Sequence, residues 1–334
     1  MEGIYQGQLE LVRLFGVSRD KIKISKNDSG VWGNILYKLI IPEKTFLYKE
    51  FIRFDLTTIN YSPPSVLPSK RLEISVRMQQ VAIKSITDST IFVPRIITVS
   101  KTSFIMEFLE PSINLKQLLD SGDSIPNLAP LGRAIAQFQN SNKNDKFAKF
   151  QDNEMLRYKI NIQYTPHQSL KLTPEECHIY KELYDEILKI EEDLPIVHGD
   201  FNSKNIVILN NDKLGIIDFE HSGSSNRIYD LVYLIADVVI ALILYPEKVV
   251  YTDSIIEFLD AYFMEANLSS NTFKSFWGHI GVQLLYRITG PSSMTWTSYF
   301  PDEAKINIKK VGKFLLKQQF TIKNIKQVLQ RAIS

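Results

Sequence analysis

Residues 196–208 read IVHGDFNSKNIVI, in which the polar octet HGDFNSKN (198–205) lies between two short β-branched runs. A second stretch of the same kind, LGIIDFEHSG, follows at 214–223. The apolar runs predict short strands on either side of a loop. A loop of this length between two strands brings its Asp and Asn side chains to one end of a hairpin, so the octet points to both the fold and the chemistry.

The octet has the spacing of a phosphoryl-transfer catalytic loop. His198, Asp200 and Asn205 form H-x-D-x-x-x-x-N, in which the Asp accepts the proton of an attacking hydroxyl and the Asn supplies an oxygen to Mg²⁺. Asp218, in the tripeptide IDF, resembles the D-F-G aspartate that binds the same metal. One Asp and one Asn suffice, because phosphate oxygens complete the coordination of Mg²⁺. The alternative is that His198 and Asp200 merely shape a turn and Asp218 caps a loop.

The first hundred residues predict a β-sheet around one main helix. KIKIS (21–25), ILYKLII (35–41) and TFLYKEF (45–51) are strand-like, IFVPRIITV and SFIMEFLE predict two more strands, and residues 69–86 have helical spacing. Residues 4–15 also have helical spacing, closed by Gly16. After Pro111 the pattern is mostly helical, and Thr173-Pro-Glu-Glu176 forms a capping box that begins one helix.

The N-terminal half also contains the parts of a phosphate-binding site. The turn KNDSGVWGN (26–34) contains Ser29, Gly30 and Gly33 between two strands, and Lys49 follows in the next strand. Glu73, on the helix after that strand, is placed to pair with Lys49. Taken alone, each residue has an ordinary explanation, a hairpin turn for the glycines and a solvated strand lysine for Lys49.

The composition is that of a soluble globular protein and excludes several classes of function. The chain has 334 residues, 44% hydrophobic and 23% charged, and a net charge of +2, which argues against nucleic-acid binding. Cys177 is the only cysteine, so a reducing, cytoplasmic location is expected. The apolar run at 231–245 is too short to span a membrane and includes Asp237, which needs a buried partner that the sequence does not name.

These residues resemble the aminoglycoside phosphotransferase and choline kinase family, which has the protein-kinase-like fold. The resemblance rests on HGD…N at 198–205, IIDFE at 216–220 and YDL at 229–231, and more loosely on the strand–lysine–helix–glutamate order of residues 21–86. It implies an α+β, bilobal fold with a small β-rich N-terminal lobe (1–108), a hinge at about 107–111 and a larger, mostly helical lobe (109–334). Asp230 would then brace the catalytic loop, although an Asp at a helix start is also a common cap.

The same resemblance implies a role for each site residue. Asp200 is expected as catalytic base, Asn205 and Asp218 as Mg²⁺ ligands, Lys49 on the nucleotide phosphates, and the backbone from Glu107 to Leu109 on the adenine. ATP is the expected nucleotide, with GTP left open.

Two departures from protein kinases favour a small-molecule acceptor. Gly199 replaces the Arg of H-R-D, and Glu220 replaces the Gly of D-F-G, with too few residues before 230 for a long regulated loop. The sequence therefore predicts transfer of the γ-phosphoryl group of ATP to a small-molecule hydroxyl. A kinase-like enzyme acting on proteins and a non-catalytic nucleotide-binding module are the alternatives.

The acceptor itself is not identified by the sequence. Aminoglycosides, choline or other amino-alcohols, and sugars all stay open, as does the oligomeric state. Aromatic residues at helical spacing are usually core residues, but in the helical lobe they can also stack on a sugar or enclose a quaternary ammonium group. The candidates for lining the acceptor site are Glu220, His221, Trp277, Tyr286, Arg287, Trp296 and Tyr299.

Overall fold

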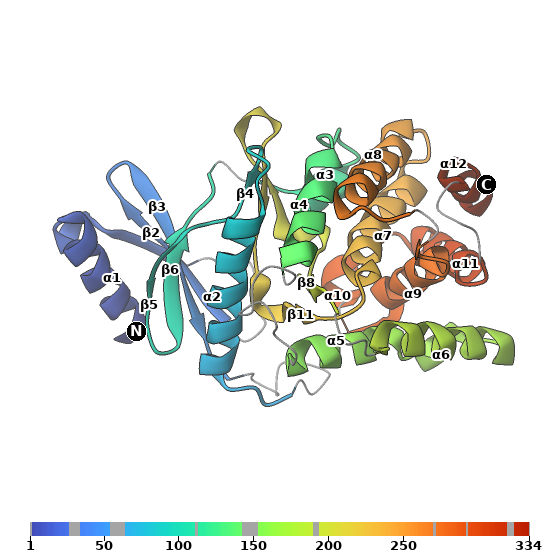
Figure 1. The fold of residues 1–334 in the computed structure, drawn as a ribbon, viewed down its shortest axis with the longest axis horizontal. Coiled ribbons are helices and arrows are strands. Elements are labelled where there is room, and N and C mark those ends of the chain that lie inside the picture. Colours follow the sequence, from blue (N-terminus) through green and yellow to red (C-terminus); the bar gives the residue numbers. More distant parts are fainter. Residues whose placement is uncertain are drawn as a thin grey trace.

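The molecule is elongated, with a β-sheet body at one end and a helical body at the other (Figure 1). The computed structural model describes residues 2–26, 34–53, 64–110, 113–141, 153–189, 194–269, 272–291, 293–318 and 324–333. The N-terminus lies at the sheet end and the C-terminus at the far helical end (Figure 1). The α+β arrangement predicted from the sequence is confirmed.

The sheet body contains five antiparallel strands in the order β1-β2-β3-β6-β5. The strands are β1 (Lys23–Lys26), β2 (Asn34–Ile41), β3 (Lys44–Phe51), β5 (Ile96–Val99) and β6 (Ser103–Glu107). Helices α1 (Glu2–Phe15) and α2 (Pro68–Ser85) lie on opposite sides of the sheet (Figure 1). The sheet is therefore covered on both faces.

Alternation along β3 decides which side chains meet each helix. Phe46 and Tyr48 pack in one cluster with Leu11 of α1, whereas Phe51 packs in another with Leu72 of α2. Successive strand residues point to opposite faces, so Lys49, two positions before Phe51, lies on the α2 side. This face is the one that looks toward the helical body (Figure 1).

Short strands connect the two bodies. A second sheet has the order β4-β10-β9-β7 and contains β4 (Ile91–Phe92), β7 (Ile113–Asn114), β9 (Ile206–Ile208) and β10 (Leu214–Ile216). A separate pair joins β8 (Ile196–Val197) to β11 (Gly223–Ser224). Because β4 pairs in parallel with β10, the chain leaving α2 is tied directly to the hairpin that follows the octet.

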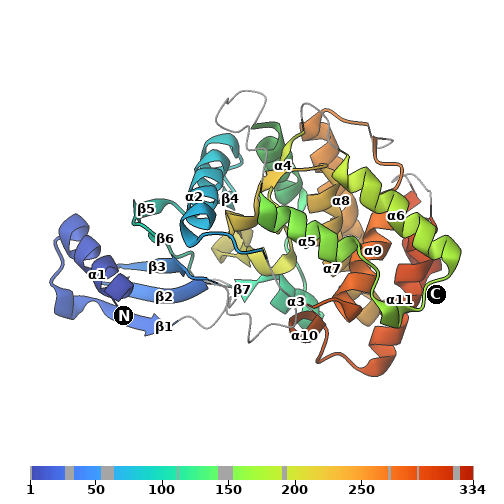
Figure 2. The ribbon, with the colours of Figure 1, turned by 90° about the horizontal axis from the view of Figure 1, so that it is seen from below.

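The helical body is built around α7 (Ile228–Leu244), whose residues from 228 to 242 are all buried. Its other helices are α3 (Leu115–Ser121), α4 (Ala129–Asn140), α5 (Glu154–Tyr164), α6 (Pro174–Leu188), α8 (Val249–Ala266), α9 (Phe276–Thr289), α10 (Ser293–Trp296), α11 (Asp302–Leu316) and α12 (Ile325–Ile333). Helices α5 and α6 run along one side of this body (Figures 1 and 2). Within the described ranges, no helix is both long and apolar enough to cross a membrane.

Candidate active site

The octet connects β8 to β9, with a 3₁₀ turn at Ser203–Asn205. Gly199 has a φ of +75°, and a Cβ there would lie 2.1 Å from the carbonyl oxygen of His221. No other residue fits so close a backbone approach at positive φ. The crossing of these two segments explains why glycine stands where protein kinases carry arginine.

Asp200 lies in this loop with both carboxylate oxygens engaged. Asn205 Nδ2 donates to the Asp200 carbonyl oxygen at 2.9 Å and to Asp200 Oδ2 at 2.8 Å. Lys159 of α5 forms an ion pair with Asp200 Oδ1 and donates to the Gly199 carbonyl oxygen at 3.0 Å. Burial would raise the pKa of Asp200, but the charge and hydrogen bond of Lys159, together with smaller contributions from His221 and His198, outweigh it and hold that pKa well below its usual range. Asp200 therefore stays ionised.

Sequence reasoning missed Lys159, although the sequence carries a signal for it. The buried positions of α5 include Met155, Leu156 and Ile160. Helical spacing puts residue 159 on the same face as 155 and 156. A lysine on an apolar helix face needs a buried anion, and here that anion is Asp200.

The second motif extends the same hairpin. Ile216 of β10 lies opposite Ile206 of β9, and the N–H of Ile217 donates to the Asn205 carbonyl oxygen at 3.1 Å. Asp218 follows with a φ of +69°. Non-glycine residues rarely adopt this conformation, and those that do cluster at functional sites. The hairpin thus places Asn205 and Asp218 at one end.

Lys49 reaches this end from the sheet body. Its Nζ lies 2.6 Å from Asp218 Oδ1 and 3.7 Å from Glu220 Oε2. Burial would lower the pKa of Lys49, but these two carboxylates outweigh it and raise that pKa. Burial raises the pKa of Asp218; Lys49 offsets part of this shift, and the charges of Glu220 and Asp200 add to it. The crowded acids make the site favourable for a further cation.

The glutamate predicted to pair with Lys49 does not reach it. Glu73 is exposed, whereas Arg71 is 1% exposed and donates to Glu220 Oε2 at 2.9 Å. Arg71 and Ser75, one turn apart, both lie on the buried face of α2, and position 73 points away from it. The expected Lys49–Glu73 pair is therefore corrected: the helix supplies an arginine, and the glutamate comes from the second motif.

Glu220, one of the predicted acceptor-site residues, is bound by side chains of the sheet body. Besides Arg71 and Lys49, it accepts a hydrogen bond of 3.1 Å from Asn34 Nδ2 of β2. All three partners belong to the sheet body. Glu220 thus lies on the Lys49 side of the site, with its charge already matched.

The remaining acceptor candidates lie in the helical body or near Asp200. The His221 side chain is 16% exposed, and its Nε2 lies 3.9 Å from Glu220 Oε1. Tyr286 and Arg287 of α9 are buried, and Trp296 of α10 is 6% exposed. The guanidinium carbon of Arg287 lies 3.8 Å from the centre of the Trp296 ring. Trp277 is fully buried, whereas Tyr299 is 56% exposed.

Two aspartates of α7 hold the catalytic loop by its backbone. Asp230 accepts from the N–H groups of His198 at 2.8 Å and Gly199 at 2.9 Å. Asp237 accepts from the Ser203 N–H at 2.9 Å and from Arg287 Nε at 2.9 Å. The predicted brace at Asp230 is formed, and the partner that Asp237 needed is supplied by Arg287 and Ser203.

The predicted nucleotide contacts lie at the end of β6. The Glu107 N–H donates to the Arg95 carbonyl oxygen and the Phe108 N–H to that of Thr45, at 2.9 and 3.1 Å. These two N–H groups cannot donate to a base as well, which leaves Leu109 as the predicted donor. Ser29, Gly30 and Gly33 lie outside the described residues.

The donors near Asp218 suit a metal shared with phosphate oxygens. Among the described residues, no group of three or more His, Cys, Asp or Glu could hold a metal by itself. Asn205 uses its Nδ2 on Asp200, which leaves its Oδ1 for a cation, and Asp218 lies at the same hairpin end. One amide and one carboxylate oxygen are what Mg²⁺ takes from a protein when phosphates supply the rest.

The sequence profile described as the phosphotransferase enzyme family matches residues 78–248, just over half of the chain. The chain belongs to the phosphotransferase enzyme family. It is therefore an enzyme of the small-molecule phosphotransferase type. The matched segment includes both motifs of this phosphotransferase and ends just after α7.

Solved structures show that the fold is protein-kinase-like. A microcompartment-associated aminopropanol kinase is 14% identical, with a TM-score of 0.55 and coverage of 99% of this chain and 98% of that one. Spectinomycin phosphotransferase, solved with ADP and spectinomycin, is 13% identical, with a TM-score of 0.54 and 98% coverage of each chain. The choline kinase from Streptococcus pneumoniae is 14% identical, with a TM-score of 0.51 and coverage of 95% and 99%.

At these identities the similarity concerns the fold alone. No curated protein sequence matches the phosphotransferase.

Proposed function

We propose that this phosphotransferase uses ATP and Mg²⁺ to phosphorylate a hydroxyl group of a small molecule. The observation that carries the proposal is the meeting of Asp200, Asn205 and Asp218 on one hairpin, opposite Lys49. We also propose that the boundary between the nucleotide-binding lobe and the helical lobe lies at residue 108, directly after β6. The protein solved with ADP and the aminopropanol and choline kinases share this fold.

The nucleotide phosphates are proposed to lie between Lys49 and the hairpin end. Lys49 would bind them through its buried, charged amine, and Leu109 would contact the base. Asn205 Oδ1 and the Asp218 carboxylate would hold Mg²⁺. The metal, when bound, neutralises charge on the phosphates during transfer.

Asp200 would accept the proton of the acceptor hydroxyl. The acceptor oxygen forms a bond to the γ-phosphorus, the bond from that phosphorus to the β,γ-bridging oxygen breaks, and ADP leaves. Because Lys159 keeps Asp200 ionised, the carboxylate is a weak base that orients the hydroxyl and takes its proton as the new bond forms. This suits a loose transition state, in which the attacking oxygen needs little early deprotonation.

The test is the variant Asp200→Asn, which keeps the shape of the side chain and removes its charge. Coupled measurement of ADP release with a panel of hydroxyl-bearing metabolites and antibiotics identifies the acceptor. With that acceptor, we expect turnover to fall about 10²- to 10⁴-fold, while calorimetry shows ADP affinity nearly unchanged.

Asp212→Asn is the matched control. Asp212 is exposed in the turn of the same hairpin and has a φ of +56°, which asparagine tolerates. This variant should keep full turnover. Normal turnover in Asp200→Asn would refute the proposed role of Asp200.

A further inference from the structure

Cationic and aromatic side chains alternate from Asp200 into the helical body. Lys159 Nζ lies 4.6 Å from the ring centre of Tyr233, and the Arg287 guanidinium carbon lies 4.3 Å from the same centre. On the Trp296 ring, the Arg287 guanidinium carbon lies at 3.8 Å and Lys204 Nζ at 4.4 Å from the centre. We call these five residues the cation–aromatic ladder.

The cations of this region pair with carboxylates, with one exception. Lys159 pairs with Asp200, and Arg287 with Asp237. Next to the ladder, Lys116 of α3 pairs with Asp120 and lies 5.4 Å from the centre of the Trp296 ring. Lys204 donates to the Thr295 carbonyl oxygen at 3.0 Å, and among the described residues no carboxylate lies within ion-pair distance of its amine.

Lys204 is therefore a cation held among cations. It is partly buried, and Arg287 and Lys116 lie over the same Trp296 ring. A half-buried amine in such a field is stabilised by an anion that comes from outside the chain.

The position of Lys204 points to the acceptor rather than to ATP. It is in the catalytic loop, four residues after Asp200, and its contacts are to Thr295 and Trp296 of α10 in the helical body. Lys49, which is proposed to bind the phosphates, reaches the site from the sheet body. Tyr299, near the same ring cluster, is 56% exposed, so the cluster extends to the surface.

We propose that Lys204, resting on Trp296, binds an anionic group of the acceptor, so that the substrate is a hydroxyl compound carrying a carboxylate or a phosphate. This inference rests on the proposed function. Polycations and quaternary ammonium compounds would be repelled by the ladder, because the acids beside it, Asp200, Asp237 and Asp120, are already paired with Lys159, Arg287 and Lys116. Neutral alcohols would lack the anchoring interaction.

The test compares acceptors that share a hydroxyl and differ in charge. Glycerate and glycerol 3-phosphate provide the carboxylate and phosphate arms, glycerol the neutral arm and choline the cationic arm. In a coupled assay of ADP release, at least one anionic acceptor should exceed glycerol and choline in kcat/KM. Whichever of glycerate and glycerol 3-phosphate has the higher kcat/KM identifies the group, carboxylate or phosphate, that Lys204 binds.

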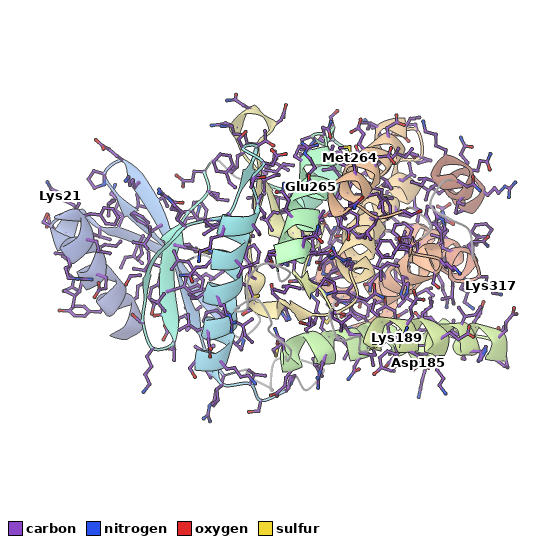
Figure 3. The ribbon with its side chains drawn as sticks, in the orientation of Figure 1. Lys21, Asp185, Lys189, Met264, Glu265 and Lys317 are labelled. Atoms are coloured by element: carbon purple, nitrogen blue, oxygen red, sulfur yellow. The ribbon has the colours of Figure 1, made fainter. Side chains whose placement is uncertain are left out.

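The variant Lys204→Gln should raise KM for the preferred anionic acceptor about 10- to 100-fold, since a hydrogen-bonded charge pair is lost. KM for ATP should not change, and Lys204→Arg should restore most of the affinity. Lys21→Gln removes the same charge at the sheet end of the molecule, where Lys21 is exposed (Figure 3). This control should behave as the wild type.

Binding measured without turnover separates this inference from the proposed function. Calorimetric titration of the ADP-saturated wild-type protein with glycerate and with glycerol 3-phosphate should show binding that Lys204→Gln loses, even if no probe is phosphorylated. If wild type and Lys204→Gln phosphorylated glycerol or choline with equal kcat/KM, the proposal of an anionic acceptor would be overturned. The proposed phosphotransferase function would still stand. Absence of anion binding in both the titration and the assay would also overturn it.

Discussion

Two side chains near Asp200, those of Lys159 and His221, differ in their charge at neutral pH. Lys159 stays protonated because its carboxylate partner outweighs the effect of burial. Burial and the Lys159 charge together lower the pKa of His221 to about 4. His221 is therefore neutral at pH 7, and its imidazole can donate or accept a hydrogen bond beside Asp200 without adding a second cation.

The lowered pKa of His221 predicts a pH-dependent stability. Its folded pKa of about 4 lies below the unfolded value of 6.5, so between these pH values the unfolded chain binds a proton that the folded chain does not. Stability is fully present above pH 6.5 and is lost as the pH falls toward 4. The loss attributable to this residue is at most about 3 kcal/mol.

Urea unfolding at several pH values between 6.5 and 4 measures this effect. His221→Asn should flatten the dependence relative to the wild type, with part remaining because burial also lowers the pKa of His198 to about 4. His178→Asn, a change at an exposed histidine, should keep the full slope. An identical slope in wild type and His221→Asn would contradict the prediction.

At the scale of elements, α7 is the part that holds the catalytic loop in place. Asp230 and Asp237 are seven residues apart, so they lie on one face of the helix, and both accept hydrogen bonds from loop N–H groups. The rest of the helix is mostly apolar, and its residues from 228 to 242 are buried. Its two carboxylates are tolerated because loop amides and Arg287 satisfy them.

Removing Arg287 should leave Asp237 as an uncompensated buried charge. We expect Arg287→Met to destabilise the protein by about 3–5 kcal/mol, as is typical when one partner of a buried pair is lost. Adding Asp237→Asn should recover part of that loss, because a neutral amide needs no counter-ion. Urea unfolding of the single and double variants measures both effects.

An exposed ion pair provides the comparison. Arg13, whose side chain is 70% exposed, pairs with Glu10 at 2.8 Å, and Arg13→Met should change stability by no more than about 1 kcal/mol. If Arg287→Met lowered the free energy of unfolding as little as Arg13→Met, the ion pair between Arg287 and Asp237 would not stabilise the catalytic loop.

For the whole molecule, the charge network around Glu220 joins the two bodies. Arg71 of α2, Asn34 of β2 and Lys49 of β3 all reach Glu220, which follows β10. Helix α2 lies between the sheet and the helical body (Figure 1). The relative position of Lys49 and Asp218 therefore depends on a link that crosses between the bodies.

Breaking this link should weaken nucleotide binding. In Arg71→Met, Glu220 loses the guanidinium that donates to it at 2.9 Å, and it competes with the phosphates for Lys49. We expect affinity for ADP with Mg²⁺ to fall about tenfold, or ~1.4 kcal/mol, by calorimetry. Circular dichroism establishes that the variant is folded.

Glu73→Gln is the control that separates the two assignments on α2. Because Glu73 is exposed and does not contact Lys49, this change should leave ADP affinity as it is. If Glu73→Gln lost as much ADP affinity as Arg71→Met, the result would support the Lys49–Glu73 pair that the sequence predicted.

Local patterns were readable from the sequence wherever neighbouring residues decide the structure. The capping box at Thr173 is formed, with Glu176 Oε2 accepting from the Thr173 N–H at 3.0 Å, and Gly16 ends α1 with a φ of +63°. The strands on either side of the octet are β8 and β9. Each of these features depends on backbone geometry over a few residues.

The sequence by itself therefore determined the hairpin, the order of the elements and the phosphotransferase motifs. Only the tertiary structure decided which charges meet: Lys49 with Glu220 rather than Glu73, Lys159 with Asp200, and Arg287 with Asp237. The partners in these pairs are far apart in the sequence, and packing of separate helices and strands brings them together. Charge pairing over such separations depends on which face of each element is buried, and that is settled only when the whole chain has folded.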